Sequence, residues 1–427
     1  MSSVISSAIP PMSYRLLHRR QFLVLATAAG LATLTSNCNR QTAPSSLDLT
    51  TASWDDIVAA ARGSTVRWAM WGGSDVTNTY ADQWVGDRLK TDYDITLNRI
   101  PLSDTVEAVN KVVGEVQAGL TSDGDIDLIW INGENFRTMK QGNLLYGPFT
   151  DLLPAMAYYD LENPAVLNDF GLPIDGYEAP YTGSYYIMAK DSSRVDAAPQ
   201  SFADLLDWAK ANPGRFAYVA PPAFDGSRFL LTVLYGVTGG YEQYAGADFN
   251  EALWEQNAPQ VVAYLKELKP YLWRGGDTYP PTQTRLNELF ANGEIWMLPI
   301  FISRVVEGLT TGQFPDSTTA FSLPGASLND PSFTAIPINA GNPAGGMVLA
   351  NLLSSPEGQL EKFKPEVWGD PPLLAVEKLP PDLQAQFAQV TADYGLPLQE
   401  LTENTVPLVN AEYTTRLENL WETELAG

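Results

Sequence analysis

The first half of the chain alternates short apolar runs with stretches of helical period. Three runs that stop at glycine or proline predict strands, at 65–71, 95–101 and 125–133. Ser53 and Asp56 form a capping pair that opens a helix expected to end near Arg62. A second helix is predicted between the first two strands, over 78–91.

A third helix is predicted from Asp104, with Glu107 three residues later as its capping partner. Residues at helical spacing predict its buried stripe: Val106, Val109, Val113, Val116 and Leu120. The order strand, helix, strand, helix, strand is typical of a mostly parallel sheet, so the predicted fold class is α/β.

The second half continues in the same way. Strands are predicted at 184–190, 215–221 and 294–301, where Pro299 places the last one at a sheet edge or bends it out of the sheet. Helices are expected at the following positions: 201–214, from about Ser227, 259–272, 284–293, and near 343–363, 380–392 and 410–424.

The N-terminal segment has the order of an export signal. Arg19 and Arg20 precede an apolar run over 22–34, and small polar residues lead to Cys38. That run is shorter than the ~20 apolar residues that span a bilayer. "RRQFL" resembles a twin-arginine signal, and Cys38 resembles the lipidated first residue of a bacterial lipoprotein.

The prediction is therefore a signal peptide over 1–37, lipidation at Cys38 and a polar tether over 38–50, which would hold the mature domain at a membrane surface. The protein is then expected in the periplasm or at the cell surface. Two different interpretations stay open: a buried N-terminal helix, and a lone free thiol at Cys38.

Charge and composition exclude several classes of function. Cleavage before Cys38 would leave 23 basic and 50 acidic residues, a net charge of −27, which repels nucleic acid phosphates. The only histidine, His18, would be removed with the signal. Catalytic triads, histidine metal sites and structural zinc sites are therefore not expected, and neither is a cofactor. A carboxylate pair, lysine, tyrosine or an oxygen-ligated metal would still be available for catalysis.

Longer motifs carry a resemblance to a known family. "DIDLIWINGENFRTMKQGNLL", "YIMAKDSSRVDAAPQSFADLLDWAK", "ELFANGEIWMLPIF" and "NPAGGMVLANLLSSPEGQLEKF" resemble bacterial ABC-transporter substrate-binding proteins with the type II periplasmic-binding fold. "INGENFRT", "PPAFDGSRFL", "KPYLWRGGDTYPP" and "VWGDPPLL" are similar to its YnjB-type branch. The resemblance covers about 50–427.

The resemblance implies two α/β lobes with mostly parallel sheets, joined by crossing strands, and a ligand held between the lobes. The expected N-terminal lobe comprises 51–180 and 295–338, and the C-terminal lobe comprises 181–294 and 339–427. It also implies a monomer that captures a small solute and delivers it to an ABC permease with its ATPase, without catalysis.

Ligands of open α/β sheets bind at the carboxyl ends of strands, near helix N-termini. Polar and aromatic residues at such positions are the predicted ligand-binding residues: Trp71, Gly72, Gly73, Asn132, Glu134, Asn135, Tyr181, Ser184, Asp225, Ser227, Arg228 and Phe301. A purely structural role is conceivable for each. Trp71 could be a core residue, Asn132 or Asn135 a helix cap, and Asp225 the cap of its own helix.

The segment 181–184 could likewise be a solvent loop, Arg228 could form a surface ion pair, and Phe301 could pack in a hinge. The ligand itself stays open, with a sugar, a thiamine-like heterocycle and a quaternary amine all compatible with the aromatic residues. Two further functions compete with the transport receptor: a secreted carbohydrate-active enzyme using paired carboxylates, and a surface adhesion or scaffold protein.

Overall fold

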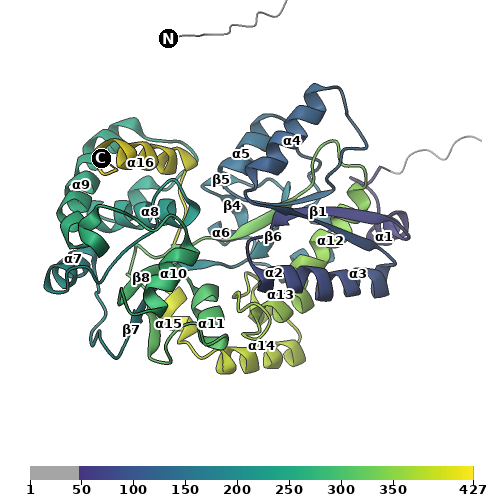
Figure 1. Cartoon of the computed structure of the whole chain (residues 1–427). Coiled ribbons are helices and arrows are strands. Elements are labelled where there is room, and N and C mark those ends of the chain that lie inside the picture. The colour runs from purple at the N-terminus through teal and green to yellow at the C-terminus, as the bar shows by residue number, and fades with distance from the viewer. Residues whose placement is uncertain (1–47, 427) are drawn as a thin grey trace, which may run out of the picture. The chain divides into compact units, whose positions relative to one another are not determined.

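Two separate five-stranded sheets organise the protein. The computed structural model describes residues 48–426, and Figure 1 shows the two groups of strands with helices around each. The predicted signal, the tether up to residue 47 and Cys38 lie outside the described residues. Within the described part, no helix is long and apolar enough to cross a membrane, and no group of three or more acidic side chains is placed to hold a metal ion.

The first sheet is built mainly from the first third of the chain. Its strands, in spatial order, are β2 (Thr96–Leu102), β1 (Thr65–Trp71), β3 (Leu128–Ile131), β11 (Ser332–Ala335) and β6 (Glu178–Thr182). β1 pairs with β2 and β3 in parallel, while β11 pairs antiparallel with both β3 and β6.

Side chains of β1 alternate between two cores, as the two-residue period of a strand requires. Val66, Trp68 and Met70 lie in the core under one set of helices, and Ala69 lies in the core on the opposite face. The helices packed around this sheet are α1 (Trp54–Ala61), α2 (Asp75–Thr79), α3 (Gly86–Tyr93), α4 (Val106–Gln117), α5 (Glu134–Gln141) and α12 (Pro343–Ser354), whereas α6 (Pro164–Leu167) buries Val166 in a core that it shares with the second sheet.

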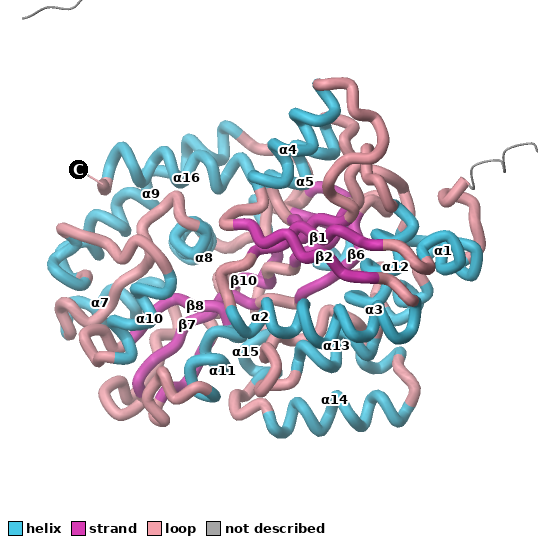
Figure 2. The backbone as a smooth tube through the Cα atoms, turned by 45° about the vertical axis from the view of Figure 1, so that its right-hand side comes forward, coloured by secondary structure: helices cyan, strands magenta, loops and turns pink. Residues whose placement is uncertain are grey.

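The second sheet consists of β12 (Val406–Pro407), β10 (Leu328–Asn329), β7 (Tyr185–Asp191), β8 (Met297–Phe301) and β9 (Thr318–Phe321). Only β10 and β12 pair in parallel. Helices cover both faces of this sheet. One face shares a core with Tyr186 and Met188 of β7 and is covered by α7 (Phe202–Ala211), α8 (Phe224–Thr238), α9 (Glu251–Leu268) and α16 (Ala411–Glu424), which Figure 2 shows at the left. The opposite face shares a core with Ile187 and Ala189 and is covered by α10 (Gln283–Ala291), α11 (Ile302–Thr310), α13 (Pro356–Phe363), α14 (Pro381–Asp393) and α15 (Leu398–Thr402).

The chain passes between the sheets at two adjacent crossings. Gly183 and Ser184 separate β6 from β7, and Asp330 and Pro331 separate β10 from β11. The Asp330 amide donates to the Ser184 carbonyl over 2.8 Å, so the two crossings are hydrogen-bonded to each other. A short two-stranded hairpin, β4 (Asn168–Asp169) and β5 (Leu172–Pro173), lies just before the first crossing.

Most predicted helices and strands are confirmed. The Ser53 and Ser201 side chains cap α1 and α7 as expected, accepting from the amides of Asp56 and Asp204. Strand 65–71 has the predicted bounds. β8 lies at a sheet edge, with Pro299 opposite Met188, as Pro299 predicted.

Four expectations were wrong in whole or in part. Of the stripe predicted for α4, Val109 is buried and Val113 and Val116 pack against the same core, but Val106 is 44% and Leu120 39% exposed. Phe216 makes only isolated bridges, so 215–221 is not a strand. The helix predicted to start at Pro259 begins eight residues earlier, at Glu251, where Asn250 supplies the cap. The sheets are mixed rather than mostly parallel. In the first sheet β11 runs antiparallel to β3 and β6, and in the second β7 runs antiparallel to β8, β9 and β10.

Strand pairing also differs from the expected division of the chain. β8, β9 and β10 fall within 295–338, yet they join the second sheet. The helix α12, expected in the C-terminal lobe, packs on β1, β3 and β6 of the first sheet. The sequence of an apolar strand does not show which of two similar sheets the strand will join. The sequence of an apolar helix likewise does not show which sheet the helix will cover.

Candidate functional site

Five predicted site residues and three residues that were not predicted meet at one place between the two sheets, which we call the cleft cluster. It consists of Trp71 and Glu134 from the first sheet's side and Phe224, Asp225, Ser227, Phe301, Arg304 and Glu418 from the second. The contacts below link its members.

Trp71 is the point of contact between the two sides. It ends β1, is half-buried, and its ring lies 5.0 Å from the Arg304 guanidinium of α11. A Cβ at Gly73 would lie 2.3 Å from the Trp71 ring, so glycine is needed for the ring to fold over this turn. Trp71 is not among the buried residues of the first sheet's core, which argues against a core tryptophan at this position.

Aromatic rings form the second side of the cluster. Phe224 is 48% exposed and stacks on Phe301, with centroids 5.8 Å apart and planes at 21°. Tyr186 packs edge-on against Phe301 at 5.0 Å, and its hydroxyl donates to the Asp225 carbonyl over 2.7 Å. Phe224 thus offers a flat apolar face to a ligand, with the partly buried Phe301 ring stacked against it.

The cleft cluster also contains carboxylates. Ala223 is the N-cap of α8, so Asp225 does not cap its helix and instead lies in the first turn. Burial raises the pKa of Asp225 to about 6, although Arg304 and Arg228 lower it. The Ser227 hydroxyl donates to Glu418 over 2.5 Å. Burial also raises the pKa of Glu418, and Glu134 adds to that rise.

Arg228 is not available to a solute. It is buried, and its Nε donates to Asp330 at the second crossing over 2.5 Å. Its guanidinium also lies 4.0 Å from the Phe224 ring and 4.8 Å from the Phe170 ring. Arg228 therefore stabilises the cleft cluster through its contacts with Asp330 and Phe224, and it does not bind an anionic solute.

The turn after β3 lies only partly within the cleft cluster. Gly133 has φ +61° and its amide donates to Asp169 over 2.6 Å, while a Cβ there would lie 3.0 Å from the Phe170 ring. Gly133 is also the N-cap of α5, so neither Asn132 nor Asn135 caps that helix. Both asparagines are half-buried and Glu134 is exposed.

Tyr181 and Ser184 belong to the crossing rather than to the cleft cluster. Tyr181 is 0% exposed and packs against Trp68, Trp130 and Trp368. The Ser184 hydroxyl donates to Thr182 and to Asp370, both over 3.2 Å. This crossing is therefore a packed and hydrogen-bonded segment, not a solvent loop.

The sequence interpretation missed Phe224, Arg304 and Glu418. Phe224 and Arg304 each lie within three residues of a predicted position, so the turn before α8 and the end of β8 already pointed to their neighbourhood. Glu418 lies on α16, nearly two hundred residues from Ser227, and no local pattern could place it there.

The segment Trp273–Gly276 lies outside the cluster, and the Arg274 guanidinium lies 4.2 Å from the centre of the Trp273 ring.

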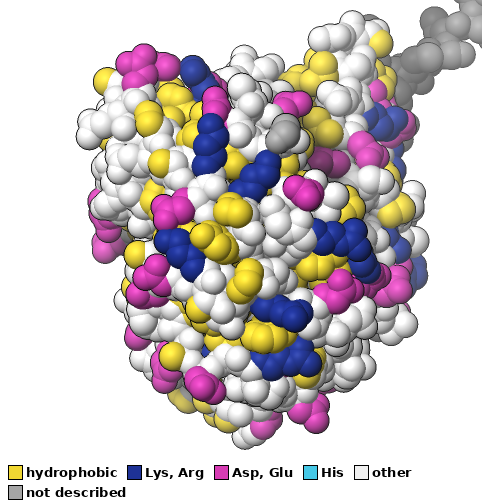
Figure 3. All heavy atoms as spheres, turned by 60° about the vertical axis from the view of Figure 1, so that its left-hand side comes forward, with side chains coloured by type: hydrophobic (Ala, Val, Ile, Leu, Met, Phe, Trp, Pro, Cys, Tyr) yellow, Lys and Arg dark blue, Asp and Glu magenta, His cyan; other side chains and the backbone are white. Residues whose placement is uncertain are grey.

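The surface does not carry its negative charge evenly. Figure 3 shows one face on which Lys and Arg side chains lie among hydrophobic ones, with acidic side chains between them. The net charge of −24 therefore does not determine the local charge of any one region. The local charge of the cleft cluster follows from the charged side chains within it and next to it.

Replacing Asp225 with asparagine is expected to stabilise the protein in a pH-dependent way. A carboxyl whose folded pKa is raised destabilises the fold as it ionises, so wild-type stability falls as pH rises from about 4 through 6. The Asp225→Asn variant should melt at the same temperature as wild type at pH 4 and at a higher temperature at pH 7. Thermal unfolding across this range checks it. If the melting temperatures of the variant and of wild type differed by the same amount at pH 4 and at pH 7, the pKa of Asp225 would not be raised by folding.

Two sheets joined by paired crossings, with aromatic and acidic side chains meeting between them, define a two-lobed α/β binding protein of the type II periplasmic-binding fold. The family described as bacterial extracellular solute-binding protein matches residues 84–390. The chain is also 36% identical over 345 residues to protein YnjB of Escherichia coli K12, covering 81% of this chain and 88% of YnjB. The chain belongs to the bacterial extracellular solute-binding protein family.

Solved structures show the same fold. The spermidine/putrescine ABC transporter substrate-binding protein PotD of Streptococcus pneumoniae aligns with a TM-score of 0.60 and 17% identity, covering 84% of this chain and 98% of PotD. The maltose-maltodextrin binding protein of Alicyclobacillus acidocaldarius aligns with a TM-score of 0.58 and 13% identity, covering 85% of this chain and 95% of that protein. At these identities the likeness concerns the fold.

Proposed function

We propose that this protein is the substrate-binding receptor of an ABC importer, which captures a small solute between its two lobes and presents it to a membrane permease driven by a separate ATPase. The observation that carries the proposal is the cleft cluster, where Trp71 of one lobe meets Arg304 of the other beside the stacked rings of Phe224 and Phe301. A solute held there would contact both lobes and so favour one arrangement of them.

The function requires no bond-breaking by the protein. Membership of the solute-binding family supports a binding role, and we propose that the carboxylates of the cleft cluster orient a solute rather than act as a catalytic pair. Export by the twin-arginine-like signal and lipidation of Cys38 are proposed as the means by which the receptor reaches and stays at the outer face of the membrane. A monomer suffices for this role.

The groups around the cleft favour a cationic solute with an apolar or ring-shaped part. Asp225, Glu134 and Glu418 supply negative charge, whereas Arg228 is neutralised by Asp330 and Arg304 pairs with Glu307 at 3.0 Å. Trp71, Phe224 and Phe301 supply faces on which a cation or a ring can lie. PotD, which shares the fold, is described as a spermidine/putrescine binding protein, and both of those compounds are cations.

Native mass spectrometry of the mature protein, isolated from its own periplasm without denaturation, tests the receptor role. We expect a stoichiometric adduct that leaves on gentle activation and whose mass identifies the solute. A thermal-shift screen with putrescine, spermidine, thiamine and maltose then tests the charge class. No adduct together with no stabilising compound would reject the receptor role, and stabilisation by maltose alone would reject the cationic class.

The Asp225→Asn variant is expected to bind a cationic solute at least about tenfold more weakly at pH 7, because a charge-assisted contact is lost. Wild-type affinity should also rise between pH 5 and 7 as Asp225 ionises, and the variant should lose that dependence. Calorimetric titration measures both. Glu255→Gln is the matched control, since Glu255 is an exposed acid on α9 that is not a member of the cluster. Equal weakening in both variants would indicate a general charge effect only.

A further inference from the structure

The β4–β5 hairpin contacts both lobes, in addition to the two crossings. At its base, Ile174 is buried in a core of the first sheet and Leu172 packs against that core. At its tip, Phe170 is buried in a core of the second sheet. We call residues 168–173 the clasp, because one short hairpin has its base in the first lobe and its tip in the second.

Polar contacts fix the base of the clasp to the first lobe. The Asp169 carboxylate accepts the Gly133 amide over 2.6 Å. Lys140 of α5 donates to the Pro173 carbonyl and pairs with Asp175 at 2.6 Å. Gly133 is the N-cap of α5 and Lys140 lies in its last turn, so the base of the clasp moves together with that helix.

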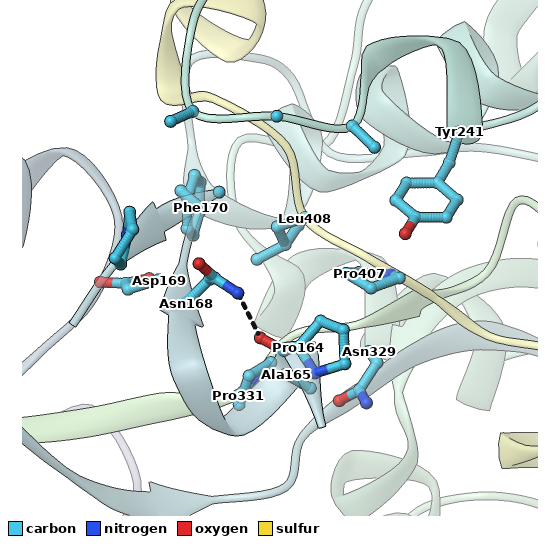
Figure 4. A pocket seen from close by; sticks show the side chains of 15 residues that line it. Pro164, Ala165, Asn168, Asp169, Phe170, Tyr241, Asn329, Pro331, Pro407 and Leu408 are labelled. Atoms are coloured by element: carbon cyan, nitrogen blue, oxygen red, sulfur yellow. Dashed lines mark hydrogen bonds between the residues drawn. The ribbon is translucent and has the colours of Figure 1, made fainter. Parts of the chain in front are cut away.

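The tip of the clasp is an unusual hairpin turn. Phe170 and Gly171 form a two-residue turn with φ values of +47° and +71°. Turns of this kind favour Asn, Asp or Gly, and a bulky side chain at positive φ strains the backbone. The centre of the Phe170 ring lies 4.8 Å from the Arg228 guanidinium, and Figure 4 shows Phe170 on the hairpin with Leu408 of the second lobe beside it. Contacts with the second lobe therefore offset the strain in this turn.

The backbone of the tip also lies against the second lobe. A Cβ on Gly171 would come within 2.7 Å of the Gly246 carbonyl oxygen and 3.4 Å of the Asn410 amide nitrogen. Beside this contact, Arg137 of α5 donates to the Asn410 side chain over 3.1 Å, and Asn410 donates to the Ala247 carbonyl over 2.5 Å. A close backbone approach and a hydrogen bond between the lobes therefore accompany the contacts of the Phe170 ring.

Two cavities border the tip of the clasp. One has a volume of about 410 Å³ and the other about 130 Å³, and Phe170 lies in the wall of both. Residues of both lobes line each cavity. The contacts of the tip with the second lobe are therefore limited, and the tip can withdraw without unpacking the rest of either core.

We propose that the clasp holds the two lobes together and so raises the share of the closed form when no solute is bound. Opening the cleft withdraws Phe170 from Arg228 and breaks the hydrogen bond between Arg137 and Asn410, which makes the open form less favourable. Phe170 lies outside the cleft cluster and acts as a positioning residue. Its effect on lobe separation does not depend on a solute. Its effect on solute affinity rests on the proposed receptor function, because only the closed form contacts the solute with both lobes.

Pulsed EPR distances between the lobes test the clasp without any solute. Nitroxide labels on Ala118→Cys at the end of α4 and Ala211→Cys at the end of α7, both exposed positions, report lobe separation in the full mature chain carrying Cys38→Ser. We expect a short-distance population in this chain that falls about tenfold in Phe170→Ala, in favour of longer distances. Phe170→Tyr keeps the ring and should retain the short distance.

Phe249→Ala is the matched control. The Phe249 ring packs against the same core as Phe170, but its ring contacts lie within the second lobe, with Trp254, Tyr413 and Arg416. Its removal should therefore loosen that core to a similar degree and leave the distances between the lobes unchanged.

A second variant decides the question if Phe170→Ala does not fold. Arg137→Leu removes the hydrogen bond between the lobes and no ring contact, so it should lengthen the distances by a smaller amount. The proposal is overturned if neither variant lengthens the distances, or if Phe249→Ala lengthens them as much as Phe170→Ala does.

Calorimetric titration with spermidine tests the effect on affinity. We expect Phe170→Ala to bind about tenfold more weakly than wild type, in proportion to its loss of the closed form. Lengthened distances with unchanged affinity would reject this effect. A wild-type protein that does not bind spermidine would count against the proposed cationic solute, and the EPR distances alone would then decide whether the clasp holds the lobes together.

Discussion

Replacing Lys362 with methionine is expected to lower the free energy of unfolding by about 3–5 kcal/mol, because it leaves a buried carboxylate without its counter-charge. Lys362 and Asp370 are both buried, with 0% and 1% of their side chains exposed, and their Nζ and Oδ2 atoms lie 2.7 Å apart. Asp370 also accepts the Ser184 hydroxyl at the first crossing. Urea unfolding measures the change.

The control lies two residues away. Lys364 pairs with Glu361 at 2.6 Å, but both side chains are partly exposed, so Lys364→Met should cost no more than about 1 kcal/mol. Combining Lys362→Met with Asp370→Leu should recover most of the loss, because no unpaired charge would then be buried. A double variant as unstable as the single one would show that the pair acts through packing rather than charge.

The second large effect is expected at Arg228. Arg228→Met should destabilise the protein by about 3–5 kcal/mol, since Asp330 would be left buried without its partner and the contacts with Phe224 and Phe170 would be lost. Urea unfolding again measures the stability. Because Phe224 lies on Arg228 in the cleft cluster, solute affinity should fall as well.

Arg285→Met is the matched control for Arg228→Met. Arg285 pairs with Glu288 at 2.7 Å on the surface, with 40% and 48% of the two side chains exposed, so its loss should be nearly neutral. A stability loss at Arg228 without any change in solute affinity would contradict the supporting role that we assign to Arg228 in the cleft cluster.

Local patterns predicted the secondary structure well but not its assembly. The capping residues Ser53 and Ser201 and the run 65–71 each depend on neighbours within a few residues, so the sequence is enough to place them. The sheet that β8 joins depends on a partner more than a hundred residues away, Tyr185–Asp191, and the strand pattern of β8 fits either sheet. The two ends of the stripe predicted for α4, Val106 and Leu120, were wrong for a related reason, because which side of a valine-rich helix is buried depends on the sheet it covers.

The candidate site shows the same division. Trp71 and Phe301 were predicted from strand ends and Asp225 from the start of a helix, and the structure brings elements carrying all three toward one region. The sequence could not distinguish Arg228, a buried structural cation, from a residue exposed to a solute, because its partner Asp330 lies 102 positions away. Tyr181 likewise resembled a hinge residue in the sequence but is enclosed by three tryptophans contributed by distant segments.

The interleaving of the two sheets has a consequence for how the chain folds as it is made. The first sheet needs β11 and its covering helix α12, which are synthesised after most of the second sheet, and the second sheet needs β12 and α16 near the end of the chain. A nascent chain emerging from the ribosome therefore cannot complete either core until synthesis is almost finished. Its apolar faces stay uncovered for nearly the whole of translation, and such non-local pairing makes folding slow. We expect the newly made chain to depend on chaperones that hold it before it folds.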